Sequence, residues 1–201
     1  MPDSTDSPDS WSSPEGISAQ KAWELDLLAE FANEATRNRA FTKLMDRYRK
    51  ALYWHIRRMV LDHDETDDLL QNTFIRCYQG LDRFEARSGL YTWLYRIATN
   101  LCLSHLSQKK RRRMLSLSDD TVRLEAELKR VTPQERLGSP EYLLEMALLK
   151  LPPKQRLVFQ MRYYDELPYE QMSEILGTSE GALKASYHLA FKKVEAILKR
   201  R

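Results

Sequence analysis

Apolar residues recur at three- and four-residue intervals along most of this chain, which is the spacing of amphipathic helices. The pattern is most regular from Ala40 to Leu61, where lysines and arginines fill much of the remaining surface. Alternating runs of β-branched residues, which are typical of strands, are almost absent. One further helix is predicted to begin at Ala22, and another is predicted to follow the acidic run Asp62–Asp68. The remaining predicted helices are Leu90–Leu106, Asp119–Val131, the segment from Ser139 to Leu151, Lys154–Tyr164, Pro168–Leu176 and the segment from Ser179 to Ile197.

The last two predicted helices have the spacing of a helix-turn-helix. Pro168 suits the first helical position, where a missing N–H costs nothing. Gly177 suits the left-handed residue that ends the first helix, and Thr178 and Ser179 can cap the second. The solvent side of the second helix is small and basic, which favours close approach to a DNA groove. An ordinary pair of packed helices with a solvated lysine face explains the same pattern.

Length and composition bound the fold. The length of 201 residues allows one domain or two small ones, and only six glycines and many helix-forming residues favour an all-α fold. Helical periodicity is lost over Met114–Gly138, so we expect two small helical domains joined by a flexible linker. The C-terminal domain is expected to be a four-helix unit that ends in the helix-turn-helix. The expected boundaries are a disordered acidic leader over 1–21, an N-terminal domain over 22–113, a linker over 114–138 and a C-terminal domain over 139–201.

Charge is distributed unevenly along the chain. The formal net charge is +3, but residues 1–34 carry eight acidic side chains against one lysine, a net of −7, which leaves +10 for the remainder. The remainder therefore has the electrostatics of a polyanion binder.

Several classes of site are not indicated. Cys77 and Cys102 lack the spacing of a zinc site or a disulfide framework, and we expect buried free thiols in a reducing cytoplasm. The four histidines are scattered and no glycine-rich phosphate loop occurs, so no metal, cofactor or catalytic site is expected. No apolar run approaches 18 residues and no signal-peptide pattern begins the chain, so no membrane insertion is expected.

Two stretches outside the helix-turn-helix carry candidate binding chemistry. Five carboxylates lie within Asp62–Asp68, more than capping of the next helix requires, which favours an exposed acidic patch for a basic partner. Farther on, Tyr91, Trp93 and Tyr95 lie among arginines, and such aromatics can stack on unpaired bases. Trp93 is expected to lie mainly in the core. The five consecutive cations of 109–113 favour a phosphate contact over a solvated linker.

Together these stretches resemble the sigma factors of bacterial RNA polymerase, of the extracytoplasmic-function type. The resemblance runs in register from Leu25 to Arg201. It implies a non-catalytic initiation factor whose partners are core RNA polymerase, promoter DNA (duplex and melted non-template strand) and, as a further possibility, an anti-sigma factor. The segments that carry it are Ala40–Tyr48, Asp64–Phe74, Thr92–Asn100, Leu151–Phe159, Tyr169–Gly177 and Gly181–Lys184.

The resemblance assigns a role to each matching stretch. The acidic helix binds polymerase while Phe74 holds it in the core, and the loop Phe84–Gly89 captures a flipped-out base. The implied polymerase-binding residues are Asp64, Glu65, Asp67, Asp68 and Gln71. The implied contacts to the proximal promoter element are Arg87, Tyr91, Arg96, Asn100, Lys109, Lys110, Arg111 and Arg112. The implied contacts to the distal element are Ser179, Gly181, Lys184, Ala185, Ser186, His188 and Lys192.

This chain also departs from the family pattern. Ser104 and Ser107 stand where many members carry Asp and Arg, and Ser186 and Leu189 stand where many carry arginines. The promoter sequence is therefore not transferable from the family. The acidic leader is longer than a minimal member needs; it either screens the basic surfaces until polymerase docks or is an unselected tail.

Two other functions fit part of the sequence. A stand-alone helix-turn-helix regulator would bind duplex DNA without polymerase, but it gives no role to the acidic helix or the Trp93 segment. A sigma-like decoy that binds an anti-sigma protein would need neither the basic tract 109–113 nor the Lys184–Lys192 face.

Overall fold

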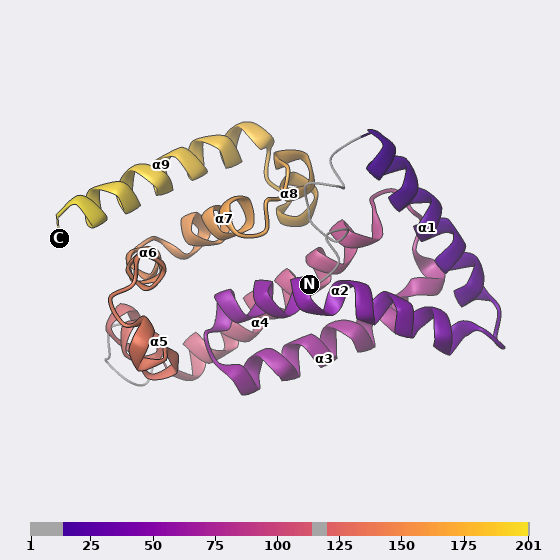
Figure 1. Ribbon diagram of the computed structural model, residues 1–201, viewed down its shortest axis with the longest axis horizontal. Coiled ribbons are helices and arrows are strands. Elements are labelled where there is room, and N and C mark those ends of the chain that lie inside the picture. Colours follow the sequence, from indigo (N-terminus) through magenta and orange to yellow (C-terminus); the bar gives the residue numbers. More distant parts are fainter. Residues whose placement is uncertain (1–13, 114–119, 201) are drawn as a thin grey trace.

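The structure is a computed structural model that describes residues 14–113 and 120–200. Within these two ranges every regular element is a helix, which confirms the all-α fold class (Figure 1). In chain order the helices are α1 (Pro14–Ala32), α2 (Arg37–Val60), α3 (His63–Gly80), α4 (Leu90–Arg113), α5 (Asp120–Val131), α6 (Pro140–Leu149), α7 (Pro153–Tyr163), α8 (Tyr169–Leu176) and α9 (Glu180–Lys199), with single 3-10 turns at Leu81–Arg83 and Gln134–Arg136.

Helices α1 to α4 pack around an apolar core. The regular stripe of α2 lies at its centre, where Leu44, Leu52 and Ile56 are fully buried. A left-handed residue, Leu61 (φ 65°), ends α2, and the Asp62 side chain then caps α3 by accepting a hydrogen bond from the Glu65 N–H (2.9 Å). This sharp turn places the acidic start of α3 directly beside the end of α2.

Helix α1 begins at Pro14 rather than at Ala22, so part of the expected disordered leader is helical. The sequence before Ala22 has no apolar periodicity, and the extension is held by tertiary contacts instead. Gln20 Nε2 donates to the Tyr48 hydroxyl (2.8 Å), and Arg47 donates to Gln20 Oε1 (2.6 Å). The rest of the expected leader, residues 1–13, lies outside the described residues.

Helix α4 extends beyond its predicted end at Leu106 and runs to Arg113. The basic tract is therefore helical, and its cations lie at the helix C-terminus, where the helix dipole favours positive charge. Lys109 also donates to the Glu65 carboxylate of α3, which ties this last part of α4 to the bundle.

Helices α6 to α9 form the C-terminal half, and α8 with α9 is the predicted helix-turn-helix. Ser139 caps α6 by accepting from the Tyr142 N–H (3.2 Å), as predicted. Gly177 adopts the predicted left-handed conformation (φ 61°), and Ser179 accepts from the Ala182 N–H (3.4 Å). Pro168 is the extended residue before α8 (ψ 148°) rather than its first residue, since the chain must turn there from the preceding loop.

The expected flexible linker contains a packed helix. Leu128 of α5 is only 4% exposed and belongs to a small apolar cluster with Leu61 and Leu149. Arg130 of α5 also lies 3.8 Å from Asp62, at the capped start of α3. The sequence of α5 is largely polar, so its position depends on these few contacts with both halves. Residues 114–119 of the linker lie outside the described ranges.

The two halves of the chain share one apolar core. Leu167, Met172 and Leu183 of the C-terminal half lie in the same buried cluster as residues of α2 and α4. In Figure 1, α9, α7 and α2 lie one above another, while α8 packs against α4. We call this packing of α7 and α8 on α2 and α4 the closed arrangement.

Candidate nucleic-acid interface

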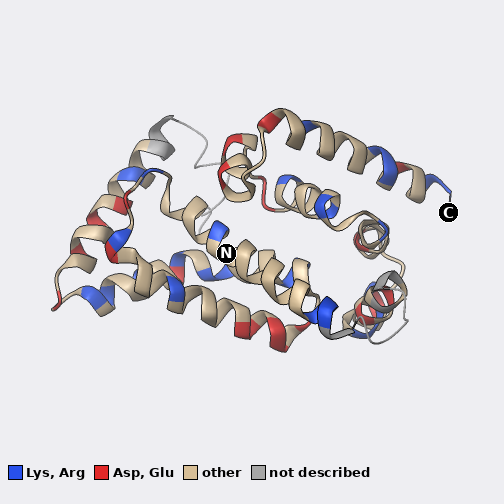
Figure 2. Ribbon diagram, turned by 180° about the vertical axis from the view of Figure 1, so that it is seen from behind, with Lys and Arg blue, Asp and Glu red and all other residues tan. Residues whose placement is uncertain are grey.

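Helix α3 presents its acidic residues to solvent because its opposite side is buried. Leu70 and Phe74 lie in the core, where the Phe74 ring meets the Phe41 ring edge-on (centroids 6.3 Å apart). The residues of the predicted polymerase-binding set that are exposed on this helix are Asp64, Asp67, Asp68 and Gln71. Figure 2 shows this acidic start of α3 close to the basic end of α4.

Glu65, the fifth residue of that set, has a different environment. Its carboxylate accepts from Lys109 Nζ and lies 3.2 Å from His105 Nε2, so it faces α4 rather than open solvent. The neighbouring carboxyl of Asp62 has a pKa below its usual range, chiefly because it accepts the hydrogen bond from the Glu65 N–H. The start of α3 therefore combines a capping carboxylate, a paired carboxylate and exposed ones.

The segment before α4 is organised around Trp93. The Trp93 ring is half-buried and packs on Phe84 (ring centroids 5.1 Å apart) and on Gly80. A Cβ atom at Gly80 would lie 3.2 Å from the Trp93 ring, so glycine permits the close approach of the indole. Trp93 thus packs as predicted and holds the loop 84–89 against the end of α3.

Most residues predicted to contact the proximal element are exposed. Arg87 lies on the loop and pairs with Glu85 (2.6 Å), and Lys109 pairs with Glu65. The remaining members whose side chains are described and exposed are Arg96, Asn100, Lys110 and Arg111. The side chain of Arg112 lies outside the described residues.

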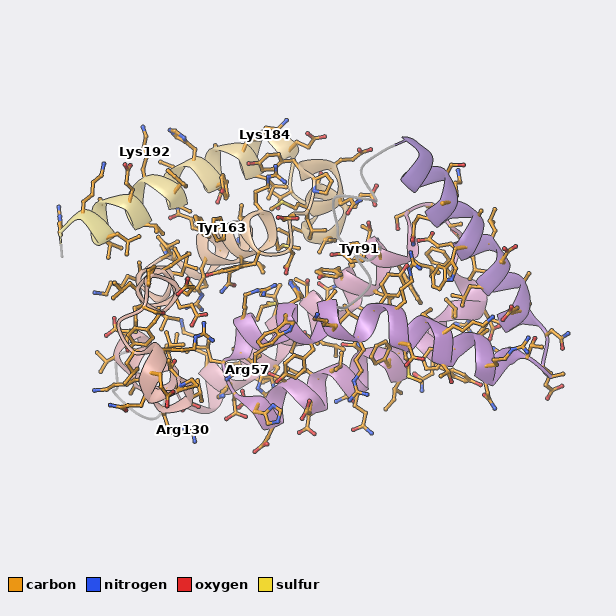
Figure 3. The ribbon with its side chains drawn as sticks, in the orientation of Figure 1. Arg57, Tyr91, Arg130, Tyr163, Lys184 and Lys192 are labelled. Carbon is orange, nitrogen blue, oxygen red and sulfur yellow. The ribbon has the colours of Figure 1, made fainter. Side chains whose placement is uncertain are left out.

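The Tyr91 ring is not exposed in the closed arrangement, and its contact with a base stays a prediction. The Tyr91 ring is half-buried between Tyr95 (centroids 4.4 Å apart) and Tyr48 (6.0 Å). Burial raises the pKa of the Tyr91 hydroxyl above its usual value. Figure 3 shows Tyr91 where α4 faces the C-terminal half. The rings of Tyr48 and Tyr95 belong to α2 and α4, and the local sequence of α4 does not reveal the contact with Tyr48.

The outer face of α9 agrees with the predicted DNA-contacting face. Its apolar stripe is buried or half-buried, and Ser186 beside it is half-buried. The Lys184 ammonium lies 3.0 Å from Glu180 and 5.5 Å from the centre of the Tyr169 ring. Figure 3 shows Lys184 and Lys192 on the outer side of α9. The exposed members of the predicted distal set are Ser179, Gly181, Lys184, Ala185, His188 and Lys192.

A buried charged cluster between the halves was not predicted from the sequence. The Asp165 carboxylate, in the loop between α7 and α8, contacts both His55 (2.8 Å) and Arg58 of α2. One indication of this cluster was present in the sequence, which is that the polar residue His55 lies in the apolar stripe of α2, next to Ile56. A polar residue at such a position needs a buried partner, but its identity cannot be read from a segment 110 residues away.

Other classes of site have no support in the described residues. Over the described ranges, no group of three or more potential metal-ligating side chains comes together. None of the helices in these ranges combines the length and the apolar character that a membrane span requires.

Two family models match the chain. Sigma-70 region 2 matches residues 44–112, and sigma-70 region 4 matches residues 142–194. The first covers most of α2 to α4 with the acidic face, and the second covers α6 to most of α9 with the helix-turn-helix.

Curated relatives match over most of their length. The ECF RNA polymerase sigma factor SigW of Bacillus subtilis is 33% identical over 156 residues, which cover 74% of this chain and 83% of SigW. The ECF RNA polymerase sigma-E factor of Escherichia coli K12 is 32% identical over 169 residues, which cover 79% of this chain and 85% of that factor.

Solved structures show the same fold. CnrH, in complex with the cytosolic domain of CnrY, superposes with a TM-score of 0.64 at 23% identity, covering 89% of this chain and 98% of CnrH. The sigma factor RpoE of Bartonella quintana, in complex with the anti-sigma factor NepR, superposes with a TM-score of 0.65 at 22% identity, covering 79% and 96%. With both region models in order and an alignment to SigW that covers 83% of that factor, the chain belongs to the ECF sigma factors of the sigma-70 family.

Proposed function

We propose that this sigma factor binds core RNA polymerase through the exposed acidic face of α3. The observation that carries the proposal is the position of Asp68 and Gln71, which are exposed on a helix whose other side is buried. Among the described residues, neither side chain has a hydrogen-bond or ion-pair partner. The neighbouring Asp67 lies 3.6 Å from His63 Nε2 and is also exposed. Exposed carboxylates on a helix fixed by its buried side suit a basic surface of a partner protein by charge complementarity.

The proposed factor contacts promoter DNA with both halves. The proximal element is contacted by the loop 84–89 and the exposed polar face of α4, and the distal element by the outer face of α9. The proposed limits of these two domains are 22–113 and 139–201, joined by a linker over 114–138. Aromatic stacking and cationic contacts to the unpaired strand supply the free energy for promoter melting, while polymerase performs the chemistry.

This role requires the closed arrangement to open. The Tyr91 ring is half-buried in the closed arrangement, and we propose that it becomes available to a base when α8 leaves α4. The chain is proposed to be non-catalytic, to need no cofactor and to act in the cytoplasm with polymerase. An anti-sigma protein is a proposed regulatory partner, because separation of the halves uncovers surfaces that such a protein can occupy.

Co-purification with core RNA polymerase tests the polymerase contact. The wild-type chain is expected to bind at nanomolar level, and Asp68→Lys combined with Gln71→Ala is expected to abolish binding while the helical circular-dichroism spectrum is retained. Asp46→Lys is the matched control, because it reverses the charge of an exposed carboxylate on α2 outside the proposed contact.

Two results would contradict the proposal. Equal loss of polymerase binding in the control and the α3 variant would assign the effect to net charge. Duplex binding by the wild-type chain without any polymerase binding would instead indicate a stand-alone helix-turn-helix regulator.

A further inference from the structure

The Asp165 carboxylate of the C-terminal half contacts side chains of α2 and is almost completely buried. Its Oδ2 lies 2.8 Å from His55 Nδ1, and its Oδ1 accepts from Arg58 Nη2. The side chains of Asp165 and His55 are 2% and 1% exposed. Burial of a charge is costly and is tolerated only with close partners, so these contacts define a specific anion site rather than a surface ion pair.

Both donors of this site belong to α2, and His55 is also held by contacts within the N-terminal half. His55 Nε2 lies 2.9 Å from the Thr99 hydroxyl of α4, and the His55 ring packs on Tyr95 (centroids 4.7 Å apart). With the proton on Nδ1, His55 donates to the carboxylate and accepts from Thr99. Arg58 follows His55 by three positions, so the two side chains lie on one face of α2. The Arg58 guanidinium also lies over the Tyr164 ring of the C-terminal half (4.8 Å), so of the two donors only His55 is positioned independently of that half.

One N–H group of Arg58 lacks an acceptor among the described residues. Arg58 Nη2 contacts Asp165, but the buried Nε–H of Arg58 has no hydrogen-bond partner among the described residues. Guanidinium groups commonly present two parallel N–H groups to one anion, and phosphate suits that geometry as well as carboxylate does. Asp165 therefore accepts from only some of the N–H donors at this site.

The loop between α7 and α8 holds Asp165 firmly in the site. The Asp165 N–H donates to the Gln160 carbonyl (3.3 Å), and the Leu167 N–H donates to the Met161 carbonyl (3.1 Å). Glu166 adopts a left-handed conformation (φ 53°), and Leu167 beyond it is buried in the shared core. The carboxylate thus enters and leaves the site together with α7 and α8.

We propose that Asp165 occupies a phosphate-binding site of the N-terminal half, and that His55 and Arg58 bind a backbone phosphate of promoter DNA once the halves separate. The inference rests on the proposed promoter-binding function and adds a site to it. A phosphate is favoured over a carboxylate of polymerase because α4, which supplies Thr99, also carries the exposed Arg96 and Asn100. Tyr91, one turn from Tyr95, supplies a ring for an adjacent base.

The test uses the full chain and separates opening from anion binding. Asp165→Asn removes the charge of the occupant with little change in shape. Dyes attached to Arg76→Cys on α3 and Ala196→Cys on α9, both exposed positions, report the distance between the halves. We expect the Asp165→Asn chain to show a longer distance and to bind a fluorescent 12-nucleotide single strand about tenfold more tightly, since one charge-assisted contact is gained.

Variants of the donors then identify the site. Adding Arg58→Ala to the Asp165→Asn chain is expected to remove the tenfold gain, and Arg58→Lys is expected to restore part of it. Arg57→Ala is the matched control, because Arg57 is the adjacent arginine of α2 and makes no contact with Asp165 among the described residues. A duplex of the same sequence shows whether the phosphate of a single strand or of a helix is preferred.

Three outcomes would overturn the inference. If the distance between the dyes does not change in Asp165→Asn, then Asp165 does not hold the halves together. If Arg57→Ala and Arg58→Ala lower the affinity equally, then the gain is non-specific charge attraction. If Arg58→Ala abolishes polymerase binding but leaves oligonucleotide binding unchanged, then the donors serve polymerase. Retained co-purification of these variants with core polymerase would separate failure of this inference from failure of the proposed function.

Discussion

Lys109 and Glu65 form an ion pair that joins the end of α4 to the first turn of α3. Lys109 belongs to the proposed DNA-contacting surface and Glu65 to the proposed polymerase-contacting surface. Each side chain is about 25% exposed, and each neutralises the other within the N-terminal half. Lys109 cannot fully contact a DNA phosphate, and Glu65 cannot fully contact polymerase, unless the ion pair between them breaks. The two surfaces are therefore electrostatically coupled.

Removing Glu65 is therefore expected to strengthen DNA binding. In Glu65→Gln, the freed Lys109 should raise the affinity for duplex DNA and make the salt dependence, d log K/d log [salt], steeper by about one, because one more phosphate is neutralised. Unfolding free energy should fall by less than about 1 kcal/mol, as for a partly exposed pair. Fluorescence anisotropy between 50 and 200 mM salt, in the range where such contacts are screened, measures the slope.

The control for this prediction is the neighbouring cation. Lys110 is exposed, so Lys110→Met should weaken DNA binding equally in the wild-type and Glu65→Gln chains. Lys109→Met should abolish the effect of Glu65→Gln. Persistence of the effect in Lys109→Met would show that Glu65 acts through overall charge.

The Asp62 cap is expected to give a pH-dependent contribution to stability. Asp62→Ala should lower the unfolding free energy by about 1 kcal/mol at neutral pH, because the Glu65 N–H loses its acceptor. Asp62→Asn keeps the acceptor and loses only the charge. Because folding lowers the pKa of Asp62, the charge contributes fully above the unfolded value of about 3.9 and is lost as the pH falls through the lower folded value.

Urea unfolding at several pH values tests this relation. The wild-type chain should be more stable than Asp62→Asn at pH 6 to 7 by about 0.5 kcal/mol, and the two stabilities should converge as the pH falls through the lowered folded pKa of Asp62. A difference that grows on acidification would contradict the lowered pKa of Asp62.

The two thiols are expected to be unreactive in the folded chain. Cys77 and Cys102 are free and fully buried, and burial raises the pKa of each thiol to about 12. Because the thiolate is the nucleophile, a disulfide reagent at pH 8 should modify them only when the protein unfolds. Ser104→Cys places a thiol at an exposed position of α4 and should react at once. Rapid loss of both native thiols without denaturant would contradict the packing.

Two lysines on the face of α9 are expected to differ in their effect on DNA binding. Lys192 is exposed and has no ion-pair partner among the described residues, whereas Lys184 is paired with Glu180. Lys192→Ala should weaken binding similarly for all distal sequences and reduce the salt slope by about one. Lys184→Ala should reduce the slope by less, because Glu180 already compensates part of its charge. Equal slopes for the two variants would contradict this distinction.

Elements specified by local sequence were predicted accurately. Ser139 and Pro140 mark the start of α6, and Gly177 marks the end of α8, because caps and left-handed residues depend on neighbouring backbone groups. The acidic face of α3 was likewise visible in the spacing of its apolar residues.

Features that depend on distant contacts were not predictable in this way. The first turns of α1 are held by the contact of Gln20 with Tyr48, and Tyr91 of α4 packs against Tyr48 of α2. His55 and Asp165 lie 110 residues apart, and no local pattern pairs them. The exposed members of the candidate surfaces were therefore predicted better than the contacts that join the halves.

Unfolding of helix α5 would lengthen the connection between the two halves. As a helix its 12 residues span about 18 Å, whereas the same residues fully extended reach about 40 Å. Few apolar contacts, centred on Leu128, keep it wound. If these contacts are released when the halves separate, the connection lengthens by about 20 Å without any change in the number of residues. The maximum separation of the two DNA-contacting surfaces therefore depends on whether α5 is helical or extended.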